Sequence, residues 1–251
     1  MRKPFIAGNW KMNTDGESSI ALASGLAEAL KSVSTVDVAV CPPFVYLQSV
    51  AKALGDSGIT MGAQDVYFEG NGAFTGEISC EMLKDVCCTY VLCGHSERRH
   101  VIGESNELIN TKLKAALAAG IKPILCVGEL LGEREGEKTD EVVTVQTKKG
   151  LDGVSAAEMA NVTIAYEPVW AIGTGKTATA GQAQEVHAMI RKLLAEIYDA
   201  TVAENTIIQY GGSAKPGNTA ELMANPDVDG LLVGGAGLKV EDFSAMINTV
   251  A

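Results

Sequence analysis

The sequence predicts a single (β/α)8 parallel barrel over residues 1–251, with an active site at the C-terminal ends of the strands. Eight short runs rich in β-branched and other apolar residues recur along the chain, and longer amphipathic stretches separate them. Nearly continuous apolar runs are typical of parallel strands that helices cover. No linker or low-complexity tract divides the chain, and its length suits one barrel. An open, doubly wound sheet is the alternative architecture.

Expected strands and helices alternate along the chain. In chain order the strands are residues 4–10, 36–42, 59–64, 89–95, 122–129, 162–168, 206–212 and 229–235. The expected helices include residues 18–32, 105–120 and 183–199. The third of these segments shows the helical spacing of apolar residues most clearly, at Val186, Met189, Ile190, Leu193, Leu194 and Ile197.

Composition limits the classes of partner. The formal net charge of −11 disfavours binding to nucleic acid or to an anionic membrane. No apolar run approaches the roughly 18 residues of a membrane span. Gly8, Asn9 and Lys11 interrupt the first apolar run, which therefore does not resemble a signal peptide, and we expect a cytoplasmic protein.

Cysteine and histidine patterns give no sign of a cofactor site. The three histidines lack ligand-like spacing, so no metal site is expected. No C-x-x-C pair occurs, and we expect six reduced thiols in the core, at Cys41, Cys80, Cys87, Cys88, Cys93 and Cys126.

The stretch AIGTGKTA (171–178) superficially resembles a phosphate-binding P-loop. That pattern requires a glycine where Trp170 stands, so we reject a nucleotide site. A lid over residues 168–178 fits better, because Pro168 stiffens one end while Gly173 and Gly175 permit unusual backbone angles. Apolar lid side chains would exclude water from a ligand.

Polar and glycine residues gather at the predicted C-terminal strand ends, where parallel folds bind ligands. Glu167, held extended before a proline and covered by the lid, is a candidate general base whose pKa burial would raise. His95 could donate a hydrogen bond as a neutral imidazole if Ser96 caps a short helix behind it. Lys11 could stabilise an oxyanion, with Asn9 orienting its neighbours.

Glycine pairs at the last two strand ends, Gly211-Gly212 and Gly234-Gly235, predict a phosphate site built from backbone N–H groups. Ser213 adds a hydroxyl and Gly173 a further N–H. Such a neutral cradle binds an anion despite the net negative charge. A base, a neutral electrophile, a cation and a phosphate cradle together suit proton abstraction beside a carbonyl through an enediolate. This chemistry requires neither metal nor redox cofactor, because the substrate carbonyl accepts the electrons.

Five motifs, in order, resemble those of the triosephosphate isomerase family: GNWKMN (8–13), CGHSERR (93–99), AYEPVWAIGTGKTA (165–178), YGGS (210–213) and LVGGA (232–236). The resemblance covers essentially the whole chain and implies interconversion of dihydroxyacetone phosphate and D-glyceraldehyde 3-phosphate, a step of glycolysis and gluconeogenesis.

The resemblance also implies roles for individual residues. Glu167 matches the base, His95 the electrophile and Lys11 the electrostatic lysine with Asn9 beside it, while Glu97 acts through Lys11. The remaining matches are phosphate contacts at Gly173, Ser213, Gly234 and Gly235, a lid-holding tyrosine at Tyr210 and a cysteine near the base at Cys126.

A homodimer is implied as well. The long segment 67–79 matches the loop that inserts into the partner, with Thr75 at its tip and Phe68 and Phe74 expected to be exposed. Alone, it could be a flexible insertion.

Two departures from the family lie beside the phosphate loops, where Ala214 and Gly237 replace the usual valine and serine. With five arginines, 7 prolines and 27 glycines, they lead us to expect a heat-labile enzyme.

Two other function classes stay open at this stage. A Schiff-base aldolase needs a lysine where Glu167 stands, and borohydride trapping of a substrate adduct would reveal it. A non-catalytic binder would retain ligand without exchanging the ligand's carbon-bound hydrogen with solvent.

Overall fold

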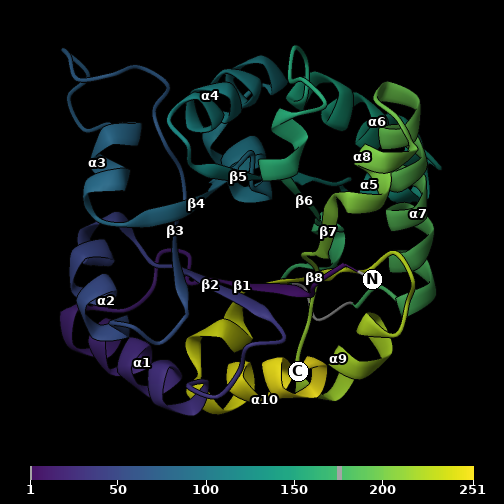
Figure 1. The fold of residues 1–251 in the computed structure, drawn as a ribbon. Coiled ribbons are helices and arrows are strands. Elements are labelled where there is room, and N and C mark those ends of the chain that lie inside the picture. The colour runs from purple at the N-terminus through teal and green to yellow at the C-terminus, as the bar shows by residue number, and fades with distance from the viewer. Residues whose placement is uncertain (1, 174–176) are drawn as a thin grey trace.

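The computed structural model describes residues 2–173 and 177–251 and contains a closed barrel of parallel strands (Figure 1). Each strand pairs with its neighbours in chain order, and β1 pairs with β8 to close the ring. The strands are β1 Phe5–Asn9, β2 Asp37–Cys41, β3 Thr60–Ala63, β4 Cys88–Cys93, β5 Lys122–Val127, β6 Thr163–Tyr166, β7 Ile207–Tyr210 and β8 Gly230–Val233. The predicted barrel is confirmed, and the open sheet is wrong.

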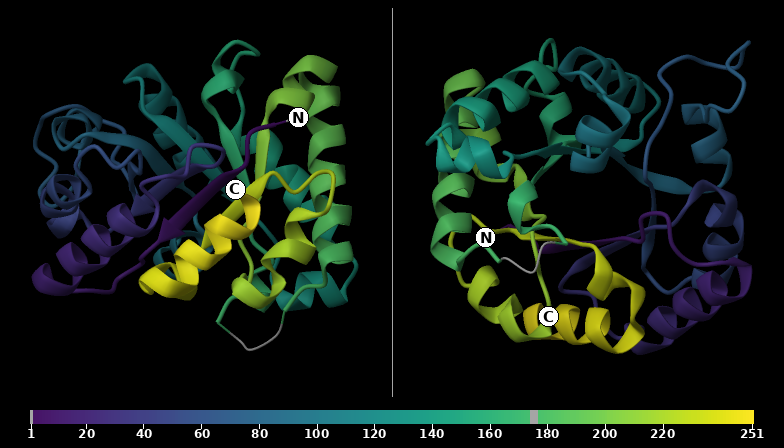
Figure 2. Two further views of the ribbon diagram at one scale, coloured as in Figure 1. Left: turned by 60° about the horizontal axis from the view of Figure 1, so that its bottom comes forward. Right: turned by 180° about the vertical axis from the view of Figure 1, so that it is seen from behind.

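Helices surround the strands, as the face and side views show (Figures 1 and 2). Five of those described begin where a side chain caps free backbone N–H groups: Asp15 before α1, Ser79 before α3, Ser105 before α4, Thr179 before α7 and Asp199 before α8. In chain order the α-helices are α1 Gly16–Ala29, α2 Leu47–Leu54, α3 Cys80–Asp85, α4 Asn106–Ala118, α5 Leu131–Glu135, α6 Thr139–Gly150, α7 Ala180–Ile197, α8 Ala200–Asn205, α9 Pro216–Met223 and α10 Val240–Val250. Short helical turns are η1 Phe44–Tyr46, η2 Arg98–Ile102, η3 Glu158–Asn161, η4 Val169–Ala171 and η5 Gly235–Leu238.

The alternation of side chains along each strand produces two apolar layers. Small and medium residues fill the barrel interior, namely Phe5, Ala7, Ala39, Cys41, Leu92, Ile124, Cys126, Ala165 and Leu232. Their sequence neighbours, such as Ile6, Leu125 and Ile164, belong to the larger layer between strands and helices. Both layers hold the strands rigidly, which fixes the positions of the side chains at the strand ends.

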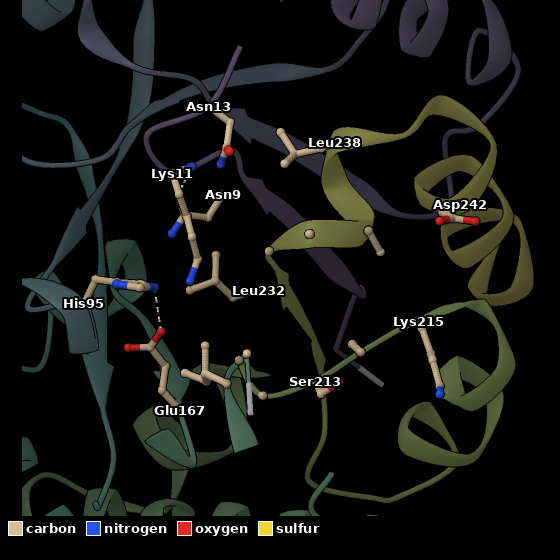
Figure 3. Close-up of a pocket in the computed structure, with 18 of the residues that line it drawn as sticks. Asn9, Lys11, Asn13, His95, Glu167, Ser213, Lys215, Leu232, Leu238 and Asp242 are labelled. Carbon is tan, nitrogen blue, oxygen red and sulfur yellow. Dashed lines mark hydrogen bonds and ion pairs between the residues drawn. The ribbon is translucent and has the colours of Figure 1, made fainter. Parts of the chain in front are cut away.

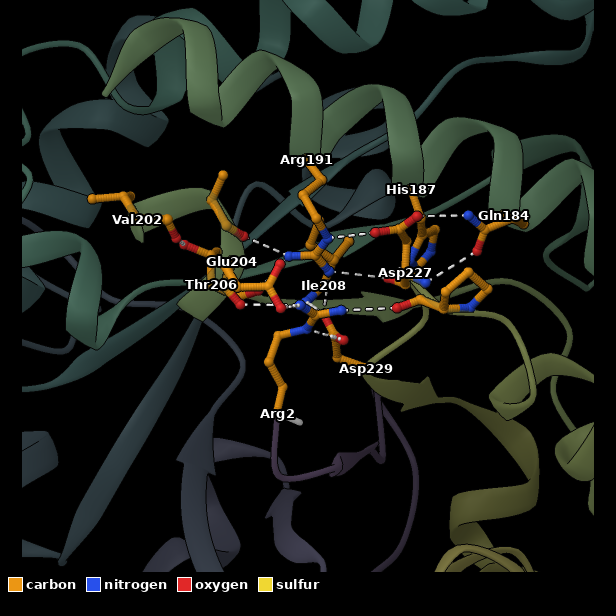
Figure 4. A network of polar contacts seen from close by, with 12 residues as sticks. Arg2, Gln184, His187, Arg191, Val202, Glu204, Thr206, Ile208, Asp227 and Asp229 are labelled. Atoms are coloured by element: carbon orange, nitrogen blue, oxygen red, sulfur yellow. Dashed lines mark hydrogen bonds and ion pairs between the residues drawn. The ribbon is translucent and has the colours of Figure 1, made fainter. Parts of the chain in front are cut away.

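A charged network lies before the first residues of β7 and β8, at the barrel end opposite the strands' C-terminal ends (Figure 4). Buried Asp229 accepts hydrogen bonds from Arg191 at 2.6 Å and from the Ile208 backbone N–H at 2.9 Å, and it also pairs with Arg2. Arg191 pairs in addition with Asp227 at 2.6 Å. The network links the N-terminal strand, α7 and the last two strands.

The cysteines differ from expectation at one position. All six are free thiols, and five are buried, but Cys87 is exposed. Cys87 lies in the turn between α3 and β4 and has a φ of 63°. Because it precedes the strand, its side chain does not follow the inward and outward alternation of β4. The prediction of a buried thiol is therefore wrong for Cys87. Within the described ranges, no helix is both long and apolar enough to span a membrane.

Candidate active site

A cleft of about 510 Å³ opens at the C-terminal ends of the strands (Figure 3). It brings together ten residues that the sequence predicted for the site: Asn9, Lys11, His95, Glu167, Gly173, Gly211, Gly212, Ser213, Gly234 and Gly235. The sequence did not single out several others that line it, including Asn13, Lys215, Leu232, Lys239 and Asp242. The cleft thus collects side chains and glycines from β1, β4, β6, β7 and β8 or from the segments that follow them.

Glu167 and His95 meet at one side of this cleft (Figure 3). The His95 Nε2 lies 2.8 Å from one carboxylate oxygen of Glu167, and the Ser96 backbone N–H donates to the other at 2.8 Å. Both side chains are buried, with residue exposures of 2% for Glu167 and 5% for His95. A carboxylate and an imidazole from β6 and β4 therefore face the same small volume.

These contacts reverse the expected direction of one pKa. Burial alone would raise the pKa of Glu167, but the charge of His95, hydrogen bonds from His95 and Ser96, and the charge of Lys11 lower it below its ordinary value. The expectation of a raised pKa is wrong for this arrangement. Glu167 is consequently held as a carboxylate, the form that can accept a proton.

The helical residues begin at Ser96 and continue into η2, so His95, rather than Ser96, occupies the position before them. The carbonyl of His95 accepts hydrogen bonds from the Arg98 and Arg99 backbone N–H groups. Its Nδ1 accepts the Glu97 backbone N–H at 3.3 Å, which leaves Nε2 as the donor in a neutral ring. Burial lowers the pKa of His95, but the charge and hydrogen bond of Glu167 outweigh this and raise it.

Lys11 is held by its backbone as well as by its side chain. Its φ of 54° is unusual for a residue with a Cβ. Its N–H donates to the Asn9 side chain at 3.0 Å, and the Gln64 side chain donates to its carbonyl at 2.7 Å. Its Nζ lies 2.6 Å from the half-exposed Glu97 carboxylate, which lines a neighbouring cleft rather than the main one. The ammonium is thereby fixed at the cleft wall.

The end of the cleft where the sequence predicted a phosphate site is built from small residues. Gly211, Gly212 and Ser213 follow β7, and Gly235 begins η5 directly after Gly234. A Cβ built on Gly234 would lie 3.4 Å from the Lys11 Cε, so this turn lies close to the ammonium. Glycines here leave backbone N–H groups accessible to an anion.

Comparison with known proteins agrees with this geometry. A family model described as triosephosphate isomerase matches residues 4–250. The chain belongs to the triosephosphate isomerase family.

Curated members of the family are similar over nearly their full lengths. The triosephosphate isomerase of Carboxydothermus hydrogenoformans is 57% identical over 98% of this chain and 98% of its own. The enzymes of Rhodopirellula baltica and Herpetosiphon aurantiacus are each 51% identical, over 98% of this chain and 97% and 99% of their own chains.

The predicted lid of this triosephosphate isomerase family member is described at both ends. Residues 174–176, which include Gly175, lie outside the described residues. At the first end Gly173 has a φ of 69°, as a flexible glycine position requires. Trp170, predicted to be an apolar cover, donates its indole N–H to Glu129 at 2.8 Å, and the Tyr166 hydroxyl donates to the same oxygen at 3.1 Å.

Sequence reasoning missed the residues that support Glu167 from behind. Glu129, the last residue of the expected strand 122–129, received no role, although it is fully buried and accepts the Trp170 indole N–H. Sequence reasoning did not consider Gly128, whose position between an apolar strand and Glu129 was the available signal. Gln146 gave no signal, because a polar residue on an amphipathic helix is ordinarily solvent-facing.

Proposed function

We propose that Glu167 is the base with which this chain interconverts dihydroxyacetone phosphate and D-glyceraldehyde 3-phosphate. The Glu167 carboxylate removes a proton from the carbon beside the substrate carbonyl, and electrons move to the carbonyl oxygen to form an enediolate. The same carboxylic acid returns the proton to the neighbouring carbon, and the hydroxyl proton of the enediolate passes from one substrate oxygen to the other by way of the His95 Nε2–H, which completes the exchange of ketone and aldehyde. His95 donates its Nε2–H to the substrate oxygens, and the Lys11 ammonium stabilises their negative charge. The contact of Glu167 with His95 inside a glycine-lined cleft supports this assignment most directly.

Substrate binding would separate the two side chains, because the reacting carbons must lie between them. The main influence that raises the pKa of His95 would then be lost. Burial, the positive charge of Lys11 and the Glu97 N–H at Nδ1 remain and favour the neutral ring, against the Glu97 carboxylate, whose smaller effect raises the pKa of His95. Breaking the Glu167–His95 contact therefore prepares a basic carboxylate and a neutral donor in one step.

At the other end of the substrate, we assign the phosphate to backbone N–H groups at Gly173, Gly234 and Gly235 and to the hydroxyl of Ser213. The segment 168–178 closes over the bound substrate, and Tyr210, buried at the end of β7, holds it shut. Closure excludes water, in which a free enediolate would eliminate its phosphate.

A coupled assay with either triose phosphate tests the activity. Glu167→Asp withdraws the carboxylate by about one methylene, so we expect turnover to fall sharply while inhibition by inorganic phosphate stays nearly unchanged. Turnover by Glu167→Gln at the wild-type rate would rule out Glu167 as the base. Ligand binding without solvent exchange of substrate hydrogen would instead identify a non-catalytic binder.

We also propose a homodimer formed through segment 67–79, which extends beyond the ring of helices just before α3 (Figures 1 and 2). Thr75 is exposed at its tip, and Tyr67 packs against Phe68 and Phe74 at ring distances of 4.4 and 4.9 Å. A second cleft of about 550 Å³ beside Lys11 and His95 would receive the partner's tip. Three apolar residues along this cleft, Met12, Val101 and Ile102, are 96%, 78% and 64% exposed. A group of exposed apolar residues of this kind is typical of a protein–protein interface.

Sedimentation at micromolar concentration tests the dimer. A charged tip, Thr75→Arg, should produce monomers with low turnover, whereas a monomeric wild-type protein with full activity would contradict the proposal.

We further propose that residues 1–251 form one domain and that the enzyme acts in the cytoplasm. Limited proteolysis and cell fractionation test these two proposals.

A further inference from the structure

Gln146, on α6, holds both backbone polar groups of a single residue. Its Oε1 accepts the Gly128 N–H at 2.7 Å, and its Nε2 donates to the Gly128 carbonyl at 3.1 Å. Gln146 is buried, with 8% of its surface exposed. The orientation of the amide follows from its partners, because only oxygen can accept the N–H and only nitrogen can donate to the carbonyl.

Gly128 in turn lies directly against the backbone of Glu167. A Cβ built on Gly128 would come within 1.7 Å of the Glu167 carbonyl oxygen, so no side chain fits between the two segments. Backbone hydrogen bonds flank this contact, from Glu167 N–H to the Val127 carbonyl at 2.7 Å and from Val169 N–H to the Glu129 carbonyl at 3.1 Å. The position of segment 127–129 therefore determines where the backbone of Glu167 lies.

We propose that Gln146 is a positioning residue for Glu167, acting through Gly128. The inference rests on the proposed role of Glu167 as the base. The paired hydrogen bonds fix the position of segment 127–129 at the end of β5. This segment in turn fixes how far the Glu167 carboxylate reaches into the cleft. The Glu129 side chain in the same segment accepts the Trp170 indole N–H, so Gln146 also helps to position Trp170.

The chemistry of the pair explains why an amide is needed. A residue without polar atoms at position 146 would leave the Gly128 N–H and carbonyl unpaired in a buried place. Segment 127–129 would shift to find other partners, and Glu167 would move with it. Displacement of a reacting group by about 1 Å can lower a rate about a hundredfold.

The first test compares two leucine variants. Gln146→Leu should lower kcat at least about tenfold while KM for glyceraldehyde 3-phosphate and inhibition by inorganic phosphate change less than about threefold. Asn110→Leu is the matched control, because Asn110 is a buried amide that donates two 2.9 Å hydrogen bonds, one to the carbonyl of Gly150 at the end of α6 and one to the carbonyl of Asp152 just after it. It should lower the melting temperature and leave kcat unchanged. Equal, wild-type kcat in both variants would overturn the proposal.

Gln146→Glu provides a second measurement, the pH dependence of kcat, which would not change if Gln146 served only the stability of the fold. A protonated carboxyl keeps one donor and one acceptor, whereas the carboxylate loses the donor and faces the Gly128 carbonyl with a negative charge. The ratio of variant to wild-type kcat, measured on folded protein from pH 5 to pH 9, should fall as pH rises. A ratio independent of pH would overturn the proposal even if Gln146→Leu does not fold. Failure of the base assignment is separate, since it would appear as full activity in Glu167→Gln.

Discussion

Adding one methyl group at Gly128 should displace the proposed base without touching any side chain of the cleft. In Gly128→Ala the new Cβ would lie 1.7 Å from the Glu167 carbonyl oxygen, whereas ordinary contact begins at 3.4 Å. The two backbones must therefore part by more than an ångström, against the 2.7 and 3.1 Å hydrogen bonds that join them on either side. A displacement of that size predicts a loss in kcat of about a hundredfold or more.

The assay is steady-state isomerisation by folded protein, with inhibition by inorganic phosphate as a measure of the phosphate site. Phosphate inhibition should change little, because three of the four proposed phosphate contacts, Ser213, Gly234 and Gly235, follow β7 and β8 rather than β6. Gly132→Ala is the matched control, since Gly132 lies in α5 and a Cβ there meets nothing within 4 Å. It should keep full activity. A Gly128→Ala enzyme with kcat within about threefold of wild type would refute the argument that this contact positions Glu167.

Three further predictions concern stability. Asp229→Ala leaves Arg2 and Arg191 without their buried partner and should lower the free energy of unfolding in urea by about 3–5 kcal/mol with kcat unchanged, whereas loss of the 71%-exposed partner in Glu204→Ala should matter by less than about 1 kcal/mol. Burial lowers the pKa of His187 to about 4, so between pH 4 and about 6.5 the unfolded chain binds a proton more readily than the folded chain. The free energy of unfolding should therefore decrease by about 3 kcal/mol as pH falls through that window. The variant His187→Gln should make the free energy of unfolding less dependent on pH in this range. Gly237→Ala places a Cβ at ordinary contact distance, 3.4 Å from the Gly8 Cα, and should raise the free energy of unfolding by about 0.4–1 kcal/mol. A wild-type melting temperature above that of mesophilic relatives would contradict the expected heat lability.

Periodicity and residue type were sufficient to predict the strands, because an apolar run bounded by glycine or polar residues has few alternatives in a parallel barrel. The same pattern placed Lys11, His95 and Glu167 at one rim, since parallel strands all end on one side. The pKa of Glu167 could not be predicted in the same way. Its direction depends on a 2.8 Å approach between side chains of β4 and β6, which no local pattern encodes.

The support of the base was also inaccessible to sequence reasoning. Gln146 contributes only because α6 packs behind the end of β5, and helix packing is decided by the whole core. Ser96 was a reasonable cap by residue type, but the turn begins one residue earlier, with the His95 carbonyl as acceptor. The exposed Cys87 likewise depends on a turn conformation rather than on hydrophobicity.

Pairing of β1 with β8 has a consequence for how the protein is made. A ribosome produces Phe5–Asn9 before the other seven strands, and one edge of this strand is covered only when Gly230–Val233 has followed. Until then the nascent chain carries an open sheet edge, which is liable to pair with other chains. The closed ring is therefore completed only after Gly230–Val233 has been synthesised, and slow translation between these two strands would prolong exposure of that edge to aggregation.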